Sequence, residues 1–221
     1  MAQIVPSILE DTQEGFADRS AEILKIPEVQ RIQVDISDGK FTPRKTLELS
    51  QIDLLSPAYF WEAHLMVENP GDYLLDAKIA GFNSAIFHFE AIPDKTNLKT
   101  MLLELQKLKL QSGLAIDLDT AVEDILEYAR FFDQVLILDV RPGYSGQKLA
   151  GDTVAKVEKL KKQLKNVKIE VDGGVKFDNI KALVRAGAEL LVVNSALFDP
   201  GPDNLTPTQN FEKLLLEAQN L

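Results

Sequence analysis

The sequence predicts a (β/α)8 TIM barrel, and three observations lead to this expectation. Short apolar, β-branched runs recur along the chain at intervals of about 20 to 35 residues. Between them lie segments whose apolar residues repeat with the period of a helix. Several runs are almost continuously apolar, as is typical of parallel strands buried on both faces. Repeated strand–helix alternation within 221 residues favours a compact barrel. A doubly wound open sheet is the main alternative.

The expected strands begin near Ile4, Ile32, Phe60, Ser84, Gly113, Val135, Val167 and Leu190. The intervening segments are expected to form helices that cover the sheet, and the pattern is clearest at 98–108 and 154–164. The stretch 199–209 is rich in Pro and Asp and precedes a last helical pattern at 211–218. We interpret this stretch as a loop after the last strand. A single domain over residues 1–221 is therefore expected.

The amino-acid composition excludes several classes of protein and of functional site. The chain is 45% hydrophobic and 26% charged, as in an ordinary globular protein. It has no cysteine, which excludes disulfides, cysteine-ligated metal centres and thiol catalysis. Thirty-four acidic against 24 basic residues give a net charge of -10, which disfavours nucleic acid as a partner. No apolar run approaches the length of a membrane span and no signal peptide is apparent, so a cytoplasmic location without membrane partners is expected.

Each expected strand carries a polar residue at or near its carboxyl end. These residues are Ser7, Asp35, His64, His88, Asp117, Asp139, Asp172 and Asn194. Helix capping would explain one or two of them. The carboxyl ends of barrel strands open on one face, where catalytic groups lie, so the complete set predicts a polar site at that face.

Both histidines of the chain belong to this set. Asp35, His64 and Asp172 could together hold Zn, Mn or Fe, because imidazole and carboxylate groups bind these metals. The alternative is that each histidine is an ordinary core residue with satisfied hydrogen bonds. Spacing alone does not decide between the two.

Two glycine-containing segments, 141–147 (RPGYSGQ) and 172–175 (DGGV), follow the sixth and seventh expected strands. Glycine lets backbone N–H groups approach an anion, and loops at this end of such barrels commonly bind phosphate. A hairpin turn is the other interpretation of 172–175. The helical pattern that follows residues 172–175 argues against the hairpin interpretation. Together the two segments predict a phosphorylated substrate.

Blocks spread over nearly the whole chain resemble the ribulose-phosphate 3-epimerase family, whose members are barrels of the ribulose-phosphate-binding type in the pentose phosphate and Calvin pathways. The matching blocks are residues 5–9, 34–43, 64–70, 88–90, 141–147, 171–174 and 194–198. Their order and spacing make the resemblance specific. The D-x-x-D-G-x-F-x-P pattern from Asp35 and the H-L-M-V block from His64 are the most distinctive.

The resemblance implies roles for individual residues. Asp35 and Asp172 would be the catalytic acid and base on opposite faces of the sugar, and with His64 and residue 33 they would hold a divalent metal. Inverting a carbon next to a ketone requires removing a proton from one face and returning one to the other, which two carboxylates can do. The metal would stabilise the enediolate as a Lewis acid. The implied substrate contacts are Ser7, His64, Gly143, Tyr144, Ser145 and Gly146, and the implied phosphate contacts are Gly173, Gly174, Asn194 and Ser195.

The sequence departs from the family pattern at the same site. Gln33 stands where the family has a metal-binding histidine, and a neutral amide is a poorer ligand for zinc, so a weakly held metal or none is expected. The other departures are Asp117 and Arg141, where the family has Asn, Asn194 for Gly, Asp139 for a small hydroxyl residue, Lys40 for His and Arg44 for Asn.

The leading hypothesis is an isomerase that inverts carbon 3 of a ketose phosphate and converts D-ribulose 5-phosphate to D-xylulose 5-phosphate. Another ketose phosphate as substrate is one alternative. A non-catalytic sugar-phosphate-binding or regulatory relative is the other, and Gln33 is the residue that favours it. A small sugar phosphate is the expected ligand. By analogy with the family, a homo-oligomer is expected.

Overall fold

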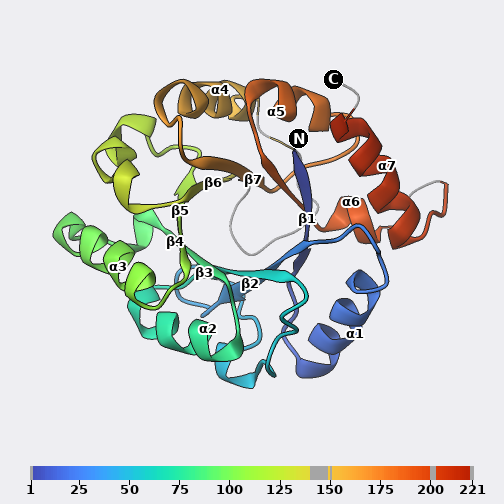
Figure 1. Ribbon diagram of the computed structural model, residues 1–221, viewed down its shortest axis with the longest axis horizontal. Helices are drawn as coiled ribbons and strands as arrows, with labels where there is room; N and C mark the ends of the chain where they lie inside the picture. The colour runs from blue at the N-terminus through green and yellow to red at the C-terminus, as the bar shows by residue number, and fades with distance from the viewer. Residues whose placement is uncertain (1, 140–148, 150, 200–202, 220–221) are drawn as a thin grey trace.

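Eight parallel strands close into a barrel in the order of the sequence (Figure 1). The structure is a computed structural model, and it describes residues 2–139, 149, 151–199 and 203–219. The strands are β1 (Gln3–Ile8), β2 (Arg31–Ser37), β3 (Phe60–Met66), β4 (Ser84–His88), β5 (Gln111–Asp117), β6 (Gln134–Leu138), β7 (Lys168–Asp172) and β8 (Leu190–Val193). β1 pairs with β8 in parallel, so the sheet has no open edge. The predicted barrel is confirmed and the open sheet is excluded.

Helices surround the barrel (Figure 1). The α-helices are α1 (Gln13–Ile23), α2 (Leu74–Ala80), α3 (Lys95–Lys107), α4 (Thr153–Gln163), α5 (Ile180–Ala186), α6 (Ser195–Phe198) and α7 (Pro207–Gln219). The 3-10 helices are η1 (Leu49–Gln51), η2 (Pro70–Tyr73), η3 (Phe89–Ala91) and η4 (Val122–Phe131). Among the described residues, no helix is long and apolar enough to span a membrane.

Two connections contain 3-10 helices in place of the α-helices found at the others. Between β2 and β3 the chain forms only the short η1; Pro43 and Pro57 flank this segment, and Gly39 has a φ of +76°. Between β5 and β6 it forms the 3-10 helix η4 in place of an α-helix. Val122 and Ile125 are the buried residues of η4, and this spacing of three matches three residues per turn.

The strands bury both of their faces, which explains the almost continuous apolar runs. In β6, Val135 and Ile137 face the core between sheet and helices, while Leu136 and Leu138 belong to a separate cluster with Ile86 and Ala115. Successive side chains of a strand point to opposite faces, so the second cluster lies inside the barrel. The barrel is therefore a packed core rather than a pore.

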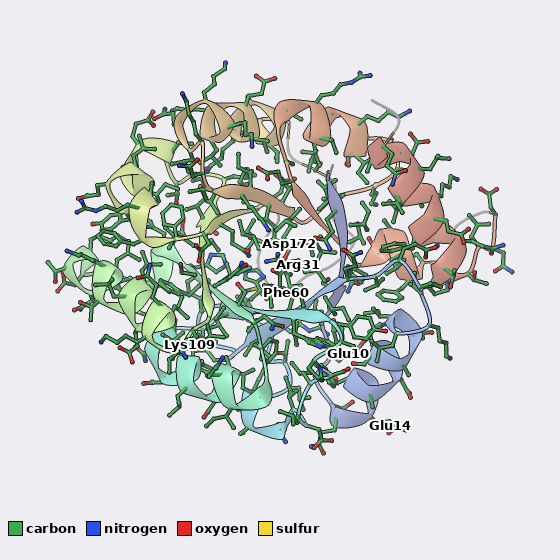
Figure 2. All side chains as sticks on the ribbon, viewed as in Figure 1. Glu10, Glu14, Arg31, Phe60, Lys109 and Asp172 are labelled. Carbon is green, nitrogen blue, oxygen red and sulfur yellow. The ribbon has the colours of Figure 1, made fainter. Side chains whose placement is uncertain are left out.

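A buried polar network crosses the amino-terminal end of the barrel. Arg31 donates from Nε to Glu62 Oε2 at 2.6 Å and from its terminal nitrogen to Gln134 Oε1. Gln134 Nε2 donates in turn to Glu170 Oε2 at 3.0 Å. In Figure 2, which looks down the barrel, Arg31 lies near the centre. Burial, and the nearby charge of Glu62, raise the pKa of Glu170 well above its usual value, so the network balances one guanidinium against one carboxylate. Sequence analysis did not predict this network.

Candidate active site

The predicted polar residues all lie at the carboxyl end of the barrel. Ser7, Asp35 and His64 are in β1, β2 and β3; His88, Asp117 and Asp172 end β4, β5 and β7; Asp139 and Asn194 directly follow β6 and β8. Gly143, Tyr144, Ser145 and Gly146 lie outside the described residues. The hydrogen bonds separate the described set into a central cluster on β2, β3 and β7 and a second cluster on β4 and β5.

The central cluster is built around His64. Its Nδ1 lies 3.0 Å from Asp35 Oδ1 and 3.3 Å from Asp172 Oδ2. The parallel register sets Asp35 directly beside His64 on the adjacent strand, whereas Asp172 reaches it from across the barrel. His64 is fully buried, and the side chain of Asp172 is 16% exposed. The structure thus brings together the three residues that sequence spacing proposed as a group, and their ligand atoms lie within 4.8 Å of one another.

Gln33, on β2, bonds to both carboxylates of the central cluster. Its Nε2 donates to Asp35 Oδ1 and to Asp172 Oδ2, each at 2.8 Å. These are the same two oxygens that face His64, so an N–H group stands where a fourth metal ligand would be required. The amide oxygen of Gln33 is buried and has no hydrogen-bond partner within the described part of the chain.

Burial and charge perturb the pKa values of this cluster. Burial, together with the nearby charge of Asp172, raises the pKa of Asp35 to about 6, although hydrogen bonds from His64 and Gln33 oppose the shift. Burial by itself would lower the pKa of His64. The hydrogen bonds to Asp172 and Asp35 and their charges overcome this effect and raise the pKa to about 9. The charged imidazole of His64 and the amide N–H2 group of Gln33 thus both face the two carboxyl groups.

The pKa of His64 predicts how stability depends on pH. Because the folded pKa is about 9 and the unfolded value 6.5, the charged imidazole contributes stability that is fully present below pH 6.5 and lost as the pH rises through 9. We expect the free energy of unfolding, measured with denaturant in the presence of a chelator, to fall across this window by up to about 3 kcal/mol. His64→Gln should abolish this slope. An equal slope in the variant and the wild type would contradict the assignment.

The second cluster consists of His88, Glu90 and Asp117. His88 Nδ1 lies 3.4 Å from Glu90 Oε2 and 3.4 Å from Asp117 Oδ1. Glu90 Oε1 accepts hydrogen bonds from Thr120 Oγ1 and from the backbone N–H of Asp117. Burial would raise the pKa of Glu90, but the imidazole of His88 beside it and the hydrogen bonds from Thr120 and the backbone N–H of Asp117 lower it to about 2. Glu90 is therefore ionised at neutral pH.

A hydrogen bond joins the two clusters, because His64 Nε2 and His88 Nε2 lie 3.0 Å apart. The two imidazole rings are also stacked, with centroids 5.2 Å apart. His88 and Asp117 were predicted at strand ends, but not as a group with Glu90. The H-x-E spacing was visible in the sequence, but the approach of Asp117 from the neighbouring strand was not.

The predicted phosphate segment turns sharply after β7. Gly173 and Gly174 both have left-handed φ values, +98° and +66°, which residues with a Cβ adopt only with strain. β7 and β8 are parallel and α5 lies between them, so the hairpin interpretation of 172–175 is wrong. The side chain of Asn194 donates to the backbone oxygen of Ser7 at 3.0 Å and ties β8 to β1.

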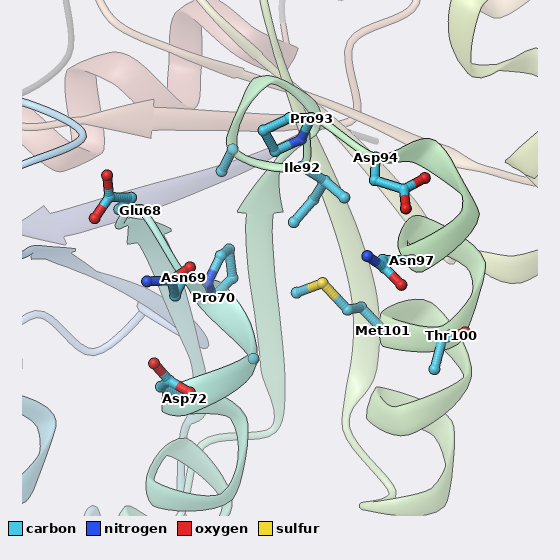
Figure 3. Close-up of a pocket in the computed structure, with 12 residues that line it drawn as sticks. Glu68, Asn69, Pro70, Asp72, Ile92, Pro93, Asp94, Asn97, Thr100 and Met101 are labelled. Carbon is cyan, nitrogen blue, oxygen red and sulfur yellow. The ribbon is translucent and has the colours of Figure 1, made fainter.

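A surface groove lies beside this end of the barrel, between η2 and the segment from η3 to α3 (Figure 3). Pro70, Ile92, Pro93 and Met101 give it an apolar floor, and Asp72 is among the acidic residues at its edge. Its wall includes Ala91, the residue next to Glu90 in η3. The groove thus adjoins the second cluster without containing its side chains.

The fold and this site define a (β/α)8-barrel protein with paired carboxylates and a histidine at the carboxyl ends of its strands. Solved structures agree with the fold. A 3-hexulose-6-phosphate synthase from Salmonella typhimurium superposes with a TM-score of 0.74 at 14% identity, covering 98% of each chain. A 3-keto-L-gulonate-6-phosphate decarboxylase from Vibrio cholerae gives a TM-score of 0.73 at 13% identity, covering 98% of this chain and 97% of the other. At such low identity these likenesses concern the fold alone.

Sequence comparison identifies the family. The family described as "Ribulose-phosphate 3 epimerase family" matches residues 3–198. The cytoplasmic isoform of ribulose-phosphate 3-epimerase from Oryza sativa is 32% identical over 211 residues, which is 90% of this chain and 90% of the relative. The ribulose-phosphate 3-epimerase of Chlamydia trachomatis is 30% identical over 221 residues, covering 96% of this chain and 91% of the relative. The chain belongs to the ribulose-phosphate 3-epimerase family, a family of isomerases that act on carbohydrates.

Proposed function

We propose that this protein inverts carbon 3 of a ketose phosphate and that its substrate pair is D-ribulose 5-phosphate and D-xylulose 5-phosphate. Family membership supports the reaction class. The observation that carries the proposal is the convergence of Asp35 and Asp172, from opposite sides of the barrel, on the same imidazole and the same amide group. Two carboxylates so placed can address both faces of one carbon atom.

In the proposed mechanism one aspartate, ionised, removes the proton from carbon 3 and leaves an enediolate. The other aspartate, protonated, returns a proton to the opposite face. The environment supports such a division, because the raised pKa of Asp35, about 6, keeps that carboxyl close to its titration point at neutral pH. In the reverse reaction the two aspartates exchange roles: the one that returned the proton now removes it, and the other returns a proton to its own face.

The negative oxygen of the enediolate requires a positive or hydrogen-bonding group beside it. In this chain the groups nearest to the carboxylates are the Nδ1–H group of His64 and the Nε2–H2 group of Gln33. We assign the stabilisation of the enediolate to them. Both are held by buried hydrogen bonds, so little reorganisation is needed as the charge develops.

The central cluster as folded does not fit a cation. The amide N–H2 group of Gln33 points at the two carboxylate oxygens that would have to bind the ion, and Nδ1 of His64 donates its proton to the same oxygens. A metal would have to displace both donors. We therefore propose a weakly held divalent ion or none at this cluster, and the mechanism above has no step that involves one.

Phosphate binding by the backbone after β7 and β8 is the remaining part of the proposal. Gly174→Val should raise the Kd for ribulose 5-phosphate at least about tenfold, because a Cβ at a φ of +66° forces the backbone away from the conformation that presents its N–H groups. Gly71→Ala is the matched control, since a Cβ at residue 71 meets no atom within 4 Å. Equal affinity of the Gly174 variant and the wild type, measured by calorimetry, would contradict the backbone site.

The direct test is conversion of ribulose 5-phosphate to xylulose 5-phosphate with and without added Zn, Mn or Fe, together with exchange of the carbon-3 proton in deuterated water. Conversion with exchange supports the epimerase. Binding of the sugar phosphate without exchange would favour the second candidate, a sugar-phosphate-binding relative, which the altered residue Gln33 makes reasonable. We further propose that the protein acts in the cytoplasm as a homo-oligomer; one relative is a cytoplasmic isoform.

A further inference from the structure

The described part of the second cluster contains several buried polar atoms without hydrogen-bond partners. His88 Nδ1, Glu90 Oε2 and Asp117 Oδ1 each lack one. The side chain of His88 is fully buried, and its free nitrogen points at both carboxylates. Buried polar atoms of native proteins are normally paired, so three unpaired atoms directed at one point call for an occupant.

We propose that His88, Glu90 and Asp117 form a binding site for one divalent transition-metal ion such as Zn²⁺. One imidazole and two carboxylates are ordinary ligands for this ion. Nothing in the proposed epimerase reaction uses this site.

The distances fit the proposal. Ligands about 2.1 Å from a tetrahedral ion lie about 3.4 Å from one another. His88 Nδ1 lies 3.4 Å from each of the two carboxylate oxygens, and all three ligand atoms lie within 4.8 Å of one another. The ligands could therefore close on an ion with small movements of Glu90 and Asp117. The side chain of Asp117 is 39% exposed, so an ion can enter from the mouth of the barrel and keep a water molecule as its fourth ligand.

Neighbouring groups support the ligand set. Glu90 uses its other oxygen, Oε1, for Thr120 and for the backbone N–H of Asp117, which leaves Oε2 directed at His88. Lys156 lies close by, and its Nζ is bonded to the backbone oxygens of Asp117, Leu118 and Thr120 rather than to a carboxylate. Lys95 Nζ likewise donates to the backbone oxygen of Phe89. Neither lysine thus forms a hydrogen bond with the carboxylates of Glu90 and Asp117 in the part of the chain that the structure describes.

The His64–His88 hydrogen bond determines which of the two histidines has an unprotonated Nδ1 that can bind a metal ion. Only one proton can lie between the two Nε2 atoms, 3.0 Å apart. If His88 Nδ1 binds an ion, the proton of the His88 ring lies on Nε2 and is donated to His64. In that ion-bound state His64 is neutral, because its Nε2 accepts the proton of His88, and its single proton lies on Nδ1, where it is bonded to Asp35. Metal-binding histidines commonly donate their other N–H in this way. The arrangement that suits an ion at His88 is therefore the one that keeps an ion away from His64.

The test is a calorimetric titration of chelator-treated protein with Zn²⁺, combined with the visible spectrum of the Co²⁺ form. We expect one ion per chain and a low-coordinate Co²⁺ spectrum. Asp117→Asn should weaken Zn²⁺ binding at least about 100-fold, because a neutral amide replaces a charged ligand. Glu90→Gln should act in the same direction. Asp119→Asn, an exposed carboxylate on the same loop, and Asp172→Asn, in the central cluster, should both leave the affinity unchanged.

The outcomes separate this site from the central one. Loss of Zn²⁺ binding in Asp172→Asn with retention in Asp117→Asn would place the ion at the central cluster and overturn the proposal. Absence of any binding by the wild type would also overturn it. Gln33→His adds a further comparison, because it removes the amide donor that blocks the central cluster: a second ion should then bind there, while the affinity of the His88 site should not change. Melting temperatures of all variants show that the fold is intact. No measurement here depends on turnover, so failure of the epimerase proposal would leave this test valid.

Discussion

Replacing Asp35 or Asp172 by asparagine is expected to lower turnover of ribulose 5-phosphate at least about 100-fold, the lower end of what a positioned acid or base contributes. Asparagine keeps the size of the side chain but can neither remove nor return the proton at carbon 3. The barrel should stay folded, because Asp35 and Asp172 lie at its mouth and not in the apolar core. Steady-state kinetics in both directions measure the effect.

The two single variants should differ in which half of the reaction they lose. If each aspartate serves one face, one variant should still exchange the carbon-3 proton of ribulose 5-phosphate with solvent, and the other that of xylulose 5-phosphate. Asp119→Asn provides the control for loss of one negative charge near the mouth and should keep its activity. Near-normal turnover in either Asp35→Asn or Asp172→Asn would remove the two-aspartate mechanism.

The largest effect on stability is expected from the buried network at the other end of the barrel. Arg31→Met should lower the free energy of unfolding by about 3–5 kcal/mol, because it leaves the carboxylate of Glu62 buried without its guanidinium. Both side chains are almost fully buried, with exposures of 4% and 0%. The guanidinium also lies over the ring of Phe60, 4.2 Å from its centroid, and that contact is lost too. Denaturant unfolding at constant pH measures the change.

Two further variants control this experiment. Lys45→Met breaks the exposed ion pair with Glu48, 2.8 Å long, and should cost less than about 1 kcal/mol. Arg31→Met combined with Glu62→Gln should recover part of the lost stability, since the unpaired charge is removed. A cost for Arg31→Met no greater than that for Lys45→Met would show that the buried pair contributes little.

Much of the fold could be predicted because its signals are local. A strand buried on both faces must be apolar throughout, as Val135 to Leu138 are, and a polar residue such as Asp172 can be accommodated only where the strand emerges. The exceptions were local as well. Pro43 and Pro57 flank the segment between β2 and β3 that forms only the short η1, and neither can donate the backbone N–H of a helix.

The amino-terminal network also had a local signal that was not used. Arg31, Glu62 and Glu170 interrupt the apolar runs near the beginnings of their strands. A charged residue in a buried strand requires a compensating charge, and three of them indicate a shared network.

The sequence by itself determined the strands, the face on which the polar residues gather and the family to which the chain belongs. Only the tertiary structure decided how those polar residues pair. Closure of the barrel places Gln33 against Asp172, 139 positions away, and turns its amide N–H2 towards two carboxylates. It also sets His88 between His64 and Asp117. Whether a hydrogen bond forms depends on differences of a few tenths of an ångström in the donor–acceptor distance and on the direction of the donor. Strand spacing in the sequence carries neither quantity, so the pairing had to come from the folded barrel.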